Sequence, residues 1–167
     1  MKNLTLLLSA IIFFSVTNIN AQKFKYGHIN GNEVYKKMVE VKKADTIYSA
    51  YVKQLEDQIK SMQEDYNAKA KDYQTNEKTL STLMKETKVD ELKSLGERIQ
   101  KFQVSAQKDA IKKQKEIYDP IKKKFNDALK TVAKKYGYKF IIDETALLYF
   151  DDVDNVTDKV EKALGIK

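Results

Sequence analysis

The feature of this chain that most limits its fold is a narrow apolar stripe that recurs every seven residues along a Lys- and Glu-rich segment. The stripe alternates steps of four and three residues, and all its positions are apolar or aromatic except Lys69 and Asn76. Its positions are Tyr48, Val52, Leu55, Ile59, Met62, Tyr66, Lys69, Tyr73, Asn76, Leu80 and Leu83. Such a stripe is typical of a coiled-coil helix, and it is narrower than the face that a globular helix buries. This helix therefore needs a partner helix, while most of its surface stays in water.

A second helical pattern, from about 89 to 136, can supply that partner. Apolar residues again step by three and four, but the phase fails between Gln107 and Glu116, and Asp119-Pro120 follows where it resumes. Because proline removes a helical hydrogen bond and clashes with the preceding turn, we expect a kink there, with Asp119 capping the next segment. The two helical segments have similar lengths about Glu86, which predicts a reversal of the chain near that residue.

Short β-type segments lie on both sides of the helical region. We expect strands at 23–29, 138–142 and 146–150, a helix capped by Asn30 with Glu33 in its first turn, and a final helix over 156–164. One continuous helix of ninety residues would be roughly 135 Å long and would keep the first strand far from the other two. A hairpin with arms of about 60 Å brings them into one sheet, so we favour the hairpin.

The expected fold class is therefore α+β and mostly α. A long antiparallel helical hairpin, the coiled-coil arm, stands on a small β-rich body. We place the body in residues 22–43 and 117–167 and the arm in residues 44–116.

The first residues have the pattern of a secretory signal peptide. Lys2 precedes an apolar run from Leu4 to Val16, and the small residue Ala21 marks the expected cleavage site. An uncleaved anchor is the alternative, although the run is short for a membrane span. We therefore expect a soluble protein that is exported. Its lack of cysteine excludes disulfides, thiolate metal sites and a lipid-bearing cysteine.

Composition and motifs argue against an enzyme and against a nucleic-acid binder. The net charge of +7 comes almost entirely from lysine, and Arg98, the better residue type for reading phosphates and bases, is the one arginine. His28 is the one histidine, so a histidine-based metal site or triad lacks its other members. The aspartates of Asp151–Asp154 lack the EF-hand spacing, and we expect a loop that caps the last helix through Asp154 or Asn155. We predict no cofactor, no metal and no nucleic acid, and only a weak attraction to anionic membrane surfaces.

Several arm residues suit adaptable contact with another polypeptide. Tyrosine is bulky for a tight two-helix seam, and Lys69 and Asn76 interrupt its distal part. Methionine and tyrosine on a loosely packed face can contact many different partners. The candidate contact residues are Tyr51, Met62, Tyr66, Lys69, Tyr73 and Met84.

The two ends of the chain resemble those of the Skp/OmpH periplasmic chaperones. Lys25-Tyr26-Gly27-His28-Ile29-Asn30, with Val34 just after, is similar to the family's opening strand and helix cap. Tyr138-Lys139-Phe140-Ile141-Ile142-Asp143, followed by 146–150, Asp152-Val153 and 156–164, is similar to its closing block. The likeness covers nearly all of the chain beyond the signal peptide, but Pro120 and an arm tip without glycine depart from the family's pattern.

The resemblance implies a homotrimer in which strands of three subunits form a small barrel and the arms enclose a cavity. That cavity would hold unfolded outer-membrane proteins without ATP and prevent their aggregation. The strand residues expected to associate are Tyr26, Ile29, Phe140, Ile142, Leu148 and Phe150. A structural coiled-coil scaffold of the cell envelope remains the alternative.

Overall fold

The computed structural model describes residues 24–166 of the chain. The predicted signal peptide, residues 1–21, lies outside the described residues, so cleavage after Ala21 stays a prediction. Across residues 24–166, no helix is both long enough and apolar enough to cross a membrane.

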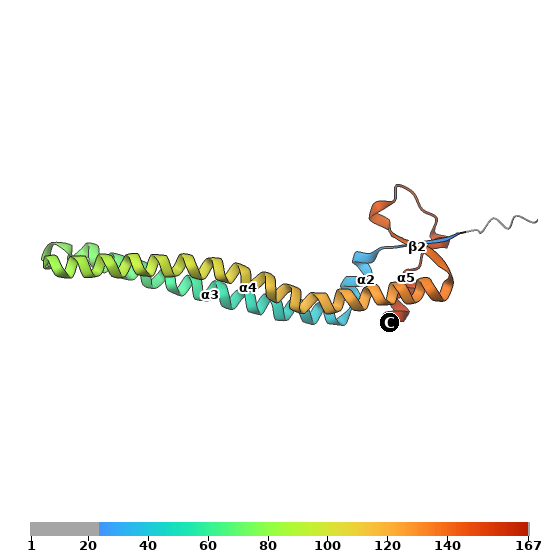
Figure 1. The fold of residues 1–167 in the computed structure, drawn as a ribbon, viewed down its shortest axis with the longest axis horizontal. Helices are drawn as coiled ribbons and strands as arrows, with labels where there is room; N and C mark the ends of the chain where they lie inside the picture. Colours follow the sequence, from blue (N-terminus) through green and yellow to red (C-terminus); the bar gives the residue numbers. More distant parts are fainter. Residues whose placement is uncertain (1–23, 167) are drawn as a thin grey trace, which may run out of the picture.

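Two long helices dominate the fold and pack along each other as an antiparallel hairpin (Figure 1). They are α3, Val39–Asn76, and α4, Thr82–Tyr136. The shorter elements are β1 (Lys25–Ile29), α2 (Gly31–Lys37), η1 (Glu77–Thr79), β2 (Tyr138–Asp143), η2 (Glu144–Ala146), η3 (Asp152–Asp154) and α5 (Thr157–Leu164), where η marks a 3₁₀ helix. The predicted reversal of the chain is confirmed, and the straight-rod alternative is wrong.

The reversal occurs at Leu80 and not near Glu86. α3 ends at Asn76, Leu80 is extended with φ −78° and ψ 142°, and α4 begins at Thr82. Ser81 caps α4 through its Oγ, which accepts a hydrogen bond from the Met84 N–H at 3.3 Å. The serine and threonine residues at 79–82 lie at this reversal. Because their side chains compete for backbone hydrogen bonds, they favour both the end of α3 and the start of α4. The tip therefore needs no glycine.

Replacing Ser81 with Ala should destabilise the start of α4 by about 1 kcal/mol, because the Met84 N–H loses its partner. Native-state hydrogen exchange of residues 80–88 measures this effect. Ser105→Ala is the matched control at an exposed position inside α4, where alanine favours the helix. Equal exchange at the tip in both variants would contradict a capping role for Ser81.

Pro120 does not interrupt α4, so the predicted new cap at Asp119 is wrong, whereas a kink of the continuous helix stays a prediction. The helix runs from Thr82 to Tyr136 with Pro120 inside it. Pro120 is exposed, so water can take the place of the hydrogen bond that it removes. On the packed side, Ile121 is buried and the Tyr118 hydroxyl donates to Asp45 Oδ1 of α3 at 2.5 Å. Packing against α3 holds the two halves of α4 in one helix.

The sheet has two strands in residues 24–166, and β1 and β2 pair in parallel. Tyr26 lies opposite Phe140, and His28 lies opposite Ile142. The predicted third strand at 146–150 is wrong for the single chain. Asp143 Oδ1 accepts the Thr145 N–H at 3.0 Å and starts the 3₁₀ helix η2, so the chain leaves the sheet there.

The two ends of the chain share one hydrophobic core on the C-terminal half of α4. Its buried members are Ile29, Val34, Ala128, Val132, Tyr138, Val156 and Val160. Gly27 allows this close packing, because a Cβ there would lie 2.7 Å from Val156 Cγ1. A second cluster of Met38, Val41, Ala44 and Ile121 continues the core to the base of the hairpin. Gly137, with φ 74°, ends α4 as predicted and lets the chain turn into β2.

Candidate functional site

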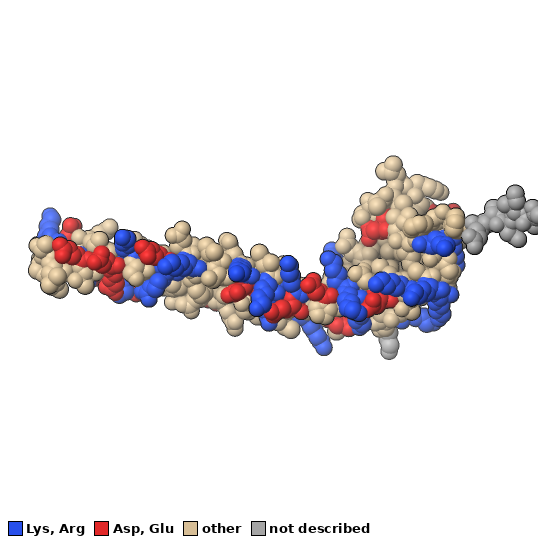
Figure 2. Space-filling model, in the orientation of Figure 1, with Lys and Arg blue, Asp and Glu red and all other residues tan. Residues whose placement is uncertain are grey.

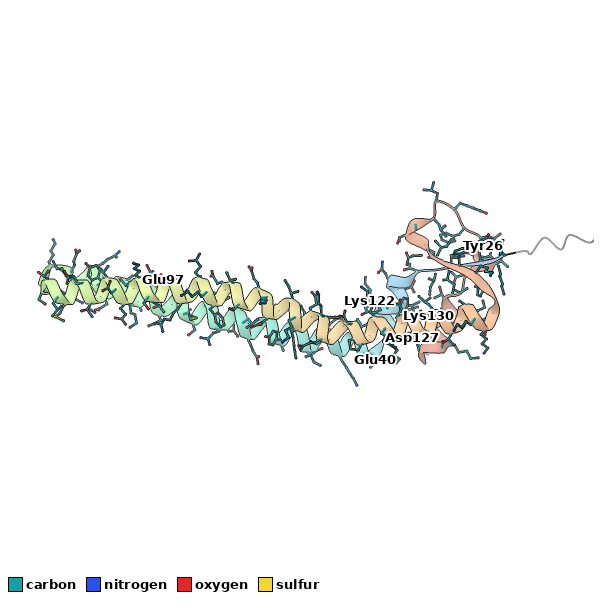
Figure 3. All side chains as sticks on the ribbon, viewed as in Figure 1. Tyr26, Glu40, Glu97, Lys122, Asp127 and Lys130 are labelled. Atoms are coloured by element: carbon teal, nitrogen blue, oxygen red, sulfur yellow. The ribbon has the colours of Figure 1, made fainter. Side chains whose placement is uncertain are left out.

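The hairpin is packed along its length but is nowhere thick enough to enclose a core. Between residues 45 and 120, all of which the structure describes, only Leu95 and Ala106 are buried. Most of the remaining seam residues are half-buried, whereas Asn76 and Leu83 are exposed. Side chains project around both helices (Figure 3). Such a hairpin offers an extended surface and no enclosed pocket.

The structure places most of the predicted contact residues in the seam, half-buried between the two helices. This group consists of Tyr51, Met62, Tyr66, Lys69 and Tyr73, whereas Met84 is 52 % exposed near the tip. Tyr66 lies against Gly96 of α4, where a Cβ would be 3.8 Å from its ring. The Lys113 ammonium lies 5.9 Å from the centre of the Tyr51 ring. These tyrosines therefore contribute to packing of the hairpin and present only part of their surface to solvent.

The polar interruption of the distal seam is closed by ion pairs between the helices. Lys69 Nζ lies 2.6 Å from Glu91 Oε1, and Lys88 Nζ lies 2.7 Å from Asp72 Oδ2. The hydrogen bond from Lys69 lowers the pKa of the Glu91 carboxyl, and the one from Lys88 lowers the pKa of Asp72. Because these groups are exposed, each pair contributes little to stability. The pairs nevertheless link α3 to α4 across the distal seam, and they engage Lys69, one of the predicted contact residues.

Other apolar residues of the hairpin are more exposed than the predicted ones. Val104 is 65 % exposed and Ile111 is 56 % exposed. They lie seven residues apart on α4, so they share one face, and neither occupies the buried seam. Sequence reasoning missed both residues, although the phase failure after Gln107 was the available signal: Ile111 is an apolar residue that does not fit the stripe. Further exposed apolar side chains of the hairpin are Val39, Ile47, Leu83 and Val89.

The body presents apolar side chains beside an open sheet edge. Tyr26 and Phe140 are 48 % and 60 % exposed, and their rings stack with centroids 6.0 Å apart. After η2, Leu148 and Tyr149 are almost fully exposed and Phe150 is partly so. Of the residues predicted to associate, Ile29 belongs to the core of the single chain and Ile142 is half-buried. Tyr26, Phe140, Leu148 and Phe150 remain on the surface.

A groove of about 610 Å³ lies where the hairpin meets the body. Tyr35, Tyr118 and Phe125 form its aromatic wall, and the Tyr35 and Phe125 rings pack edge to face. Burial of the phenol and its hydrogen bond to Asp45 raise the pKa of Tyr118 to about 12. Tyr118 is therefore a neutral donor at physiological pH, and its role in the groove is structural.

Charge is distributed unevenly over the molecule. Figure 2 shows lysines gathered over the C-terminal part of α4, whereas acidic and basic side chains alternate along the hairpin. Lys122 and Lys130 lie on this part of α4, with Asp127 between them, and Glu40 of α3 lies beneath it (Figure 3). Lys124 forms an ion pair with Glu40 and lowers its pKa. The body therefore presents the more basic surface.

Among residues 24–166, no group of three or more His, Cys, Asp or Glu side chains is placed so that it could bind a metal ion. The Asp151–Asp154 loop is used for capping. Asp151 Oδ1 accepts from the Val153 N–H at 3.1 Å, and Asn155 Oδ1 accepts from the Thr157 N–H at 2.8 Å. Asn155 therefore accepts one N–H of the first turn of α5, but Val156, and not the predicted Asp154 or Asn155, is the N-cap residue, and it makes no side-chain capping hydrogen bond.

Comparison with known proteins places this architecture in a family. The model of the outer membrane protein (OmpH-like) family matches residues 25–164. A crystal structure from Caulobacter crescentus CB15, described as that of an OmpH-like outer membrane chaperone, superimposes with a TM-score of 0.74. The two sequences are 14 % identical, and the match covers 84 % of this chain and 83 % of that one, so it shows the shared fold. No curated protein matches the chain significantly. Since the family model spans both strands, the hairpin and the closing helix, this chain belongs to the OmpH-like family, which is not a family of enzymes.

Proposed function

We propose that the protein is an ATP-independent holdase chaperone of the periplasm. It binds unfolded outer-membrane proteins between helical arms and prevents their aggregation. The observation that carries the proposal is the hairpin itself, whose exposed apolar side chains are dispersed among acidic and basic residues with no enclosed pocket between them. Weak, dispersed contacts suit a client without fixed structure, and binding to the unfolded state keeps it from aggregating.

Within this proposal, residues 44–116 form the arm, and residues 22–43 and 117–167 form the body. Three bodies associate through the sheet, because β2 has no strand partner on its outer edge in the described chain. Open strand edges favour pairing with another chain, and closing a barrel removes them. Tyr26, Phe140, Leu148 and Phe150 lie at this surface in the single chain and would become buried in the trimer.

The arm offers two groups of contact residues. The half-buried seam residues Tyr51, Met62, Tyr66 and Tyr73 become available where the helices separate, whereas Val104 and Ile111 are available without any movement. We therefore propose that Val104 and Ile111 make the first contacts with a client. The lysine-rich body adds a long-range attraction to acidic segments and, weakly, to anionic membranes.

An aggregation assay tests the proposal. The mature protein, in excess over a β-barrel client diluted from urea, should suppress light scattering by the client. Val104→Gln combined with Ile111→Gln should raise the concentration needed for half-suppression about three- to tenfold, because two exposed apolar side chains are lost.

The control is Val104→Leu combined with Ile111→Leu, which keeps both positions apolar and should retain full suppression. Equal activity of the Gln and Leu variants would remove these residues from the client-binding surface. Failure of the unmodified protein to suppress aggregation at several-fold excess would contradict the holdase function as a whole.

A structural scaffold is the second candidate, and the ion pairs of Lys69 with Glu91 and of Lys88 with Asp72 favour it. They close the distal seam more completely than the sequence indicated. A scaffold binds a defined folded partner and no unfolded client. Client capture, combined with gel filtration and light scattering for the mass of the assembly, separates the two functions.

A further inference from the structure

The one histidine of the chain is buried at a junction between the sheet and the segment that follows β2. His28 lies on β1 and is 3 % exposed. Its Nδ1 is 2.8 Å from Glu144 Oε1, and its Nε2 is 2.9 Å from the carbonyl oxygen of Asp151. The Phe150 ring covers the imidazole at a centroid distance of 4.4 Å. Both ring nitrogens are therefore engaged by residues more than a hundred positions away in the sequence.

The chemistry of the two partners selects the protonation state of this histidine. A carboxylate oxygen and a carbonyl oxygen only accept hydrogen bonds, and a neutral imidazole has a single N–H to donate. The imidazolium form donates to both oxygens at once. When the ring loses its proton, a nitrogen lone pair must face either Glu144 or Asp151, and that contact becomes unfavourable.

These two contacts hold the ends of a segment that has few other attachments. Glu144 starts η2 and Asp151 precedes η3, while Leu148 and Tyr149 between them are almost fully exposed. Asn155 Nδ2 supports the pair by donating to the same Glu144 oxygen at 3.2 Å. The position of residues 147–150 thus depends strongly on His28.

We propose that His28 and Glu144 form a proton-dependent clasp that fixes residues 144–151 on β1, so that protonation of His28 favours association of the subunits. The coupling to association rests on the proposed function, because Leu148 and Phe150 are among the residues expected to meet another subunit. Mildly acidic conditions strengthen the clasp, and alkaline conditions release the segment from one of its two contacts.

The charges around the pair favour the imidazolium. Glu144 lines a cavity of about 510 Å³ with further charged side chains from η3, α2 and α5. They are Asp152, Glu33, Lys37, Asp158, Lys159 and Glu161. Lys37 already pairs with Glu33 at 2.8 Å and Glu161 at 2.9 Å, so the surroundings of Glu144 remain acidic.

The balance between burial and hydrogen bonding at His28 determines whether the stability of the fold rises or falls with pH. Burial lowers the pKa of His28, but the hydrogen bonds to the Asp151 carbonyl and Glu144 outweigh it and raise the pKa above 6.5. A raised pKa in the folded state means that protonation stabilises the fold. This stabilisation is complete below pH 6.5 and is lost as the pH rises through the pKa of the folded protein.

Nuclear magnetic resonance on the mature protein tests the clasp directly, because the single histidine gives one set of imidazole signals. The titration should give a pKa above 6.5. The hydrogen-exchange protection factors of residues 144–151 should fall as the pH rises through the pKa found in this titration, while those of residues 90–105 in the hairpin stay constant. Glu144→Gln should lower the proton affinity of His28 at least about tenfold and abolish the change in protection.

Glu33→Gln is the matched control, since it removes a carboxylate from the same cavity without touching His28. It should shift the histidine titration far less than Glu144→Gln does, because Glu33 is paired with Lys37 at 2.8 Å and makes no contact with His28. A pKa at or below 6.5 in the unmodified protein, or protection of residues 144–151 that stays constant across the titration of His28, would overturn the clasp.

Sedimentation velocity from pH 6 to pH 8 tests the coupling to association. The dissociation constant of the assembly should rise with pH in the unmodified protein and stay constant in Glu144→Gln. A dissociation constant that does not change with pH in the unmodified protein would overturn the coupling. These measurements need no client, so their failure is distinct from a failure of the holdase proposal, which the aggregation assay detects.

Discussion

Replacing Val34 with Asp should unfold or severely destabilise the body, with a loss of at least about 3 kcal/mol in the free energy of unfolding. Val34 is 0 % exposed and lies in α2, in the core formed with Ile29, Val132, Val156 and Val160. None of these neighbours offers a polar side chain to the new carboxylate. Because the new carboxylate would be buried without a hydrogen-bond or ion-pair partner, either it becomes protonated or the core opens to water.

Val39→Asp is the control, because it introduces the same charge five residues later. Val39 is 60 % exposed and begins α3, and Met38 before it makes no side-chain capping hydrogen bond. A carboxylate in the first turn is favoured by the helix dipole, so stability should change by no more than about 0.5 kcal/mol. Urea unfolding, combined with hydrogen exchange of β1, α2 and α5, measures both variants. Similar losses in the two variants would show that α2 is not part of the core.

The helices of this fold were predictable because the capping residues at their ends and the period of their apolar residues indicate the same segments. Asn30 accepts the Glu33 N–H at 3.1 Å, as the capping pattern predicted, and Gly137 and Gly165 end α4 and α5 with positive φ. The reversal followed from the cost of unpaired strand edges. Its position did not, because apolar periodicity through Leu80 and Leu83 continues past the real end of α3. The serine and threonine side chains at 79–82 outweigh that pattern locally.

The errors at 146–150 and in the cap expected at Asp119 depend largely on contacts between residues that are distant in the sequence. The sequence of residues 146–150 has a strand-like composition, but Asp143 and His28 redirect the chain through contacts with Thr145, Glu144 and Asp151. A histidine more than a hundred residues away is invisible to a local pattern. Pro120 remains in a helix because packing on the opposite face compensates for the missing hydrogen bond.

The sequence identifies the hairpin as the exposed element, but most of the contact residues that it suggests are half-buried, and which residues contact a client stays a prediction. The heptad pattern identifies the hairpin as the exposed, extended element. It also selects residues on the seam, which are the residues that the partner helix covers. The exposure of residues outside the seam, such as Val104 and Ile111, depends on the rotation of each helix about its own axis. Contacts between the helices, such as that of Tyr66 with Gly96, determine this rotation.

Replacing Leu95 with Ala should separate the helices of the hairpin locally and cost about 2 to 3 kcal/mol of stability. Leu95 is 3 % exposed, whereas nearly every other seam residue stays half-buried. Leu95 is therefore the largest buried side chain of the hairpin between residues 45 and 120, and it contributes locally to the packing of α3 against α4. The expected cost lies at the low end for a buried leucine, because a two-helix layer can close around the cavity more easily than a thick core can. Thermal unfolding followed by the helical circular dichroism signal measures the loss.

Leu83→Ala makes the same chemical change in the same helix at a position that is 72 % exposed. It should alter stability by less than about 0.5 kcal/mol, since little apolar contact is lost and alanine favours the helix. Hydrogen exchange should increase near Leu95 and in the facing part of α3 for Leu95→Ala alone, while protection of the body stays unchanged. Loss of protection in the body as well would mean that the hairpin and the body unfold as one cooperative unit. Equal melting temperatures for the two variants would contradict a seam that depends on Leu95.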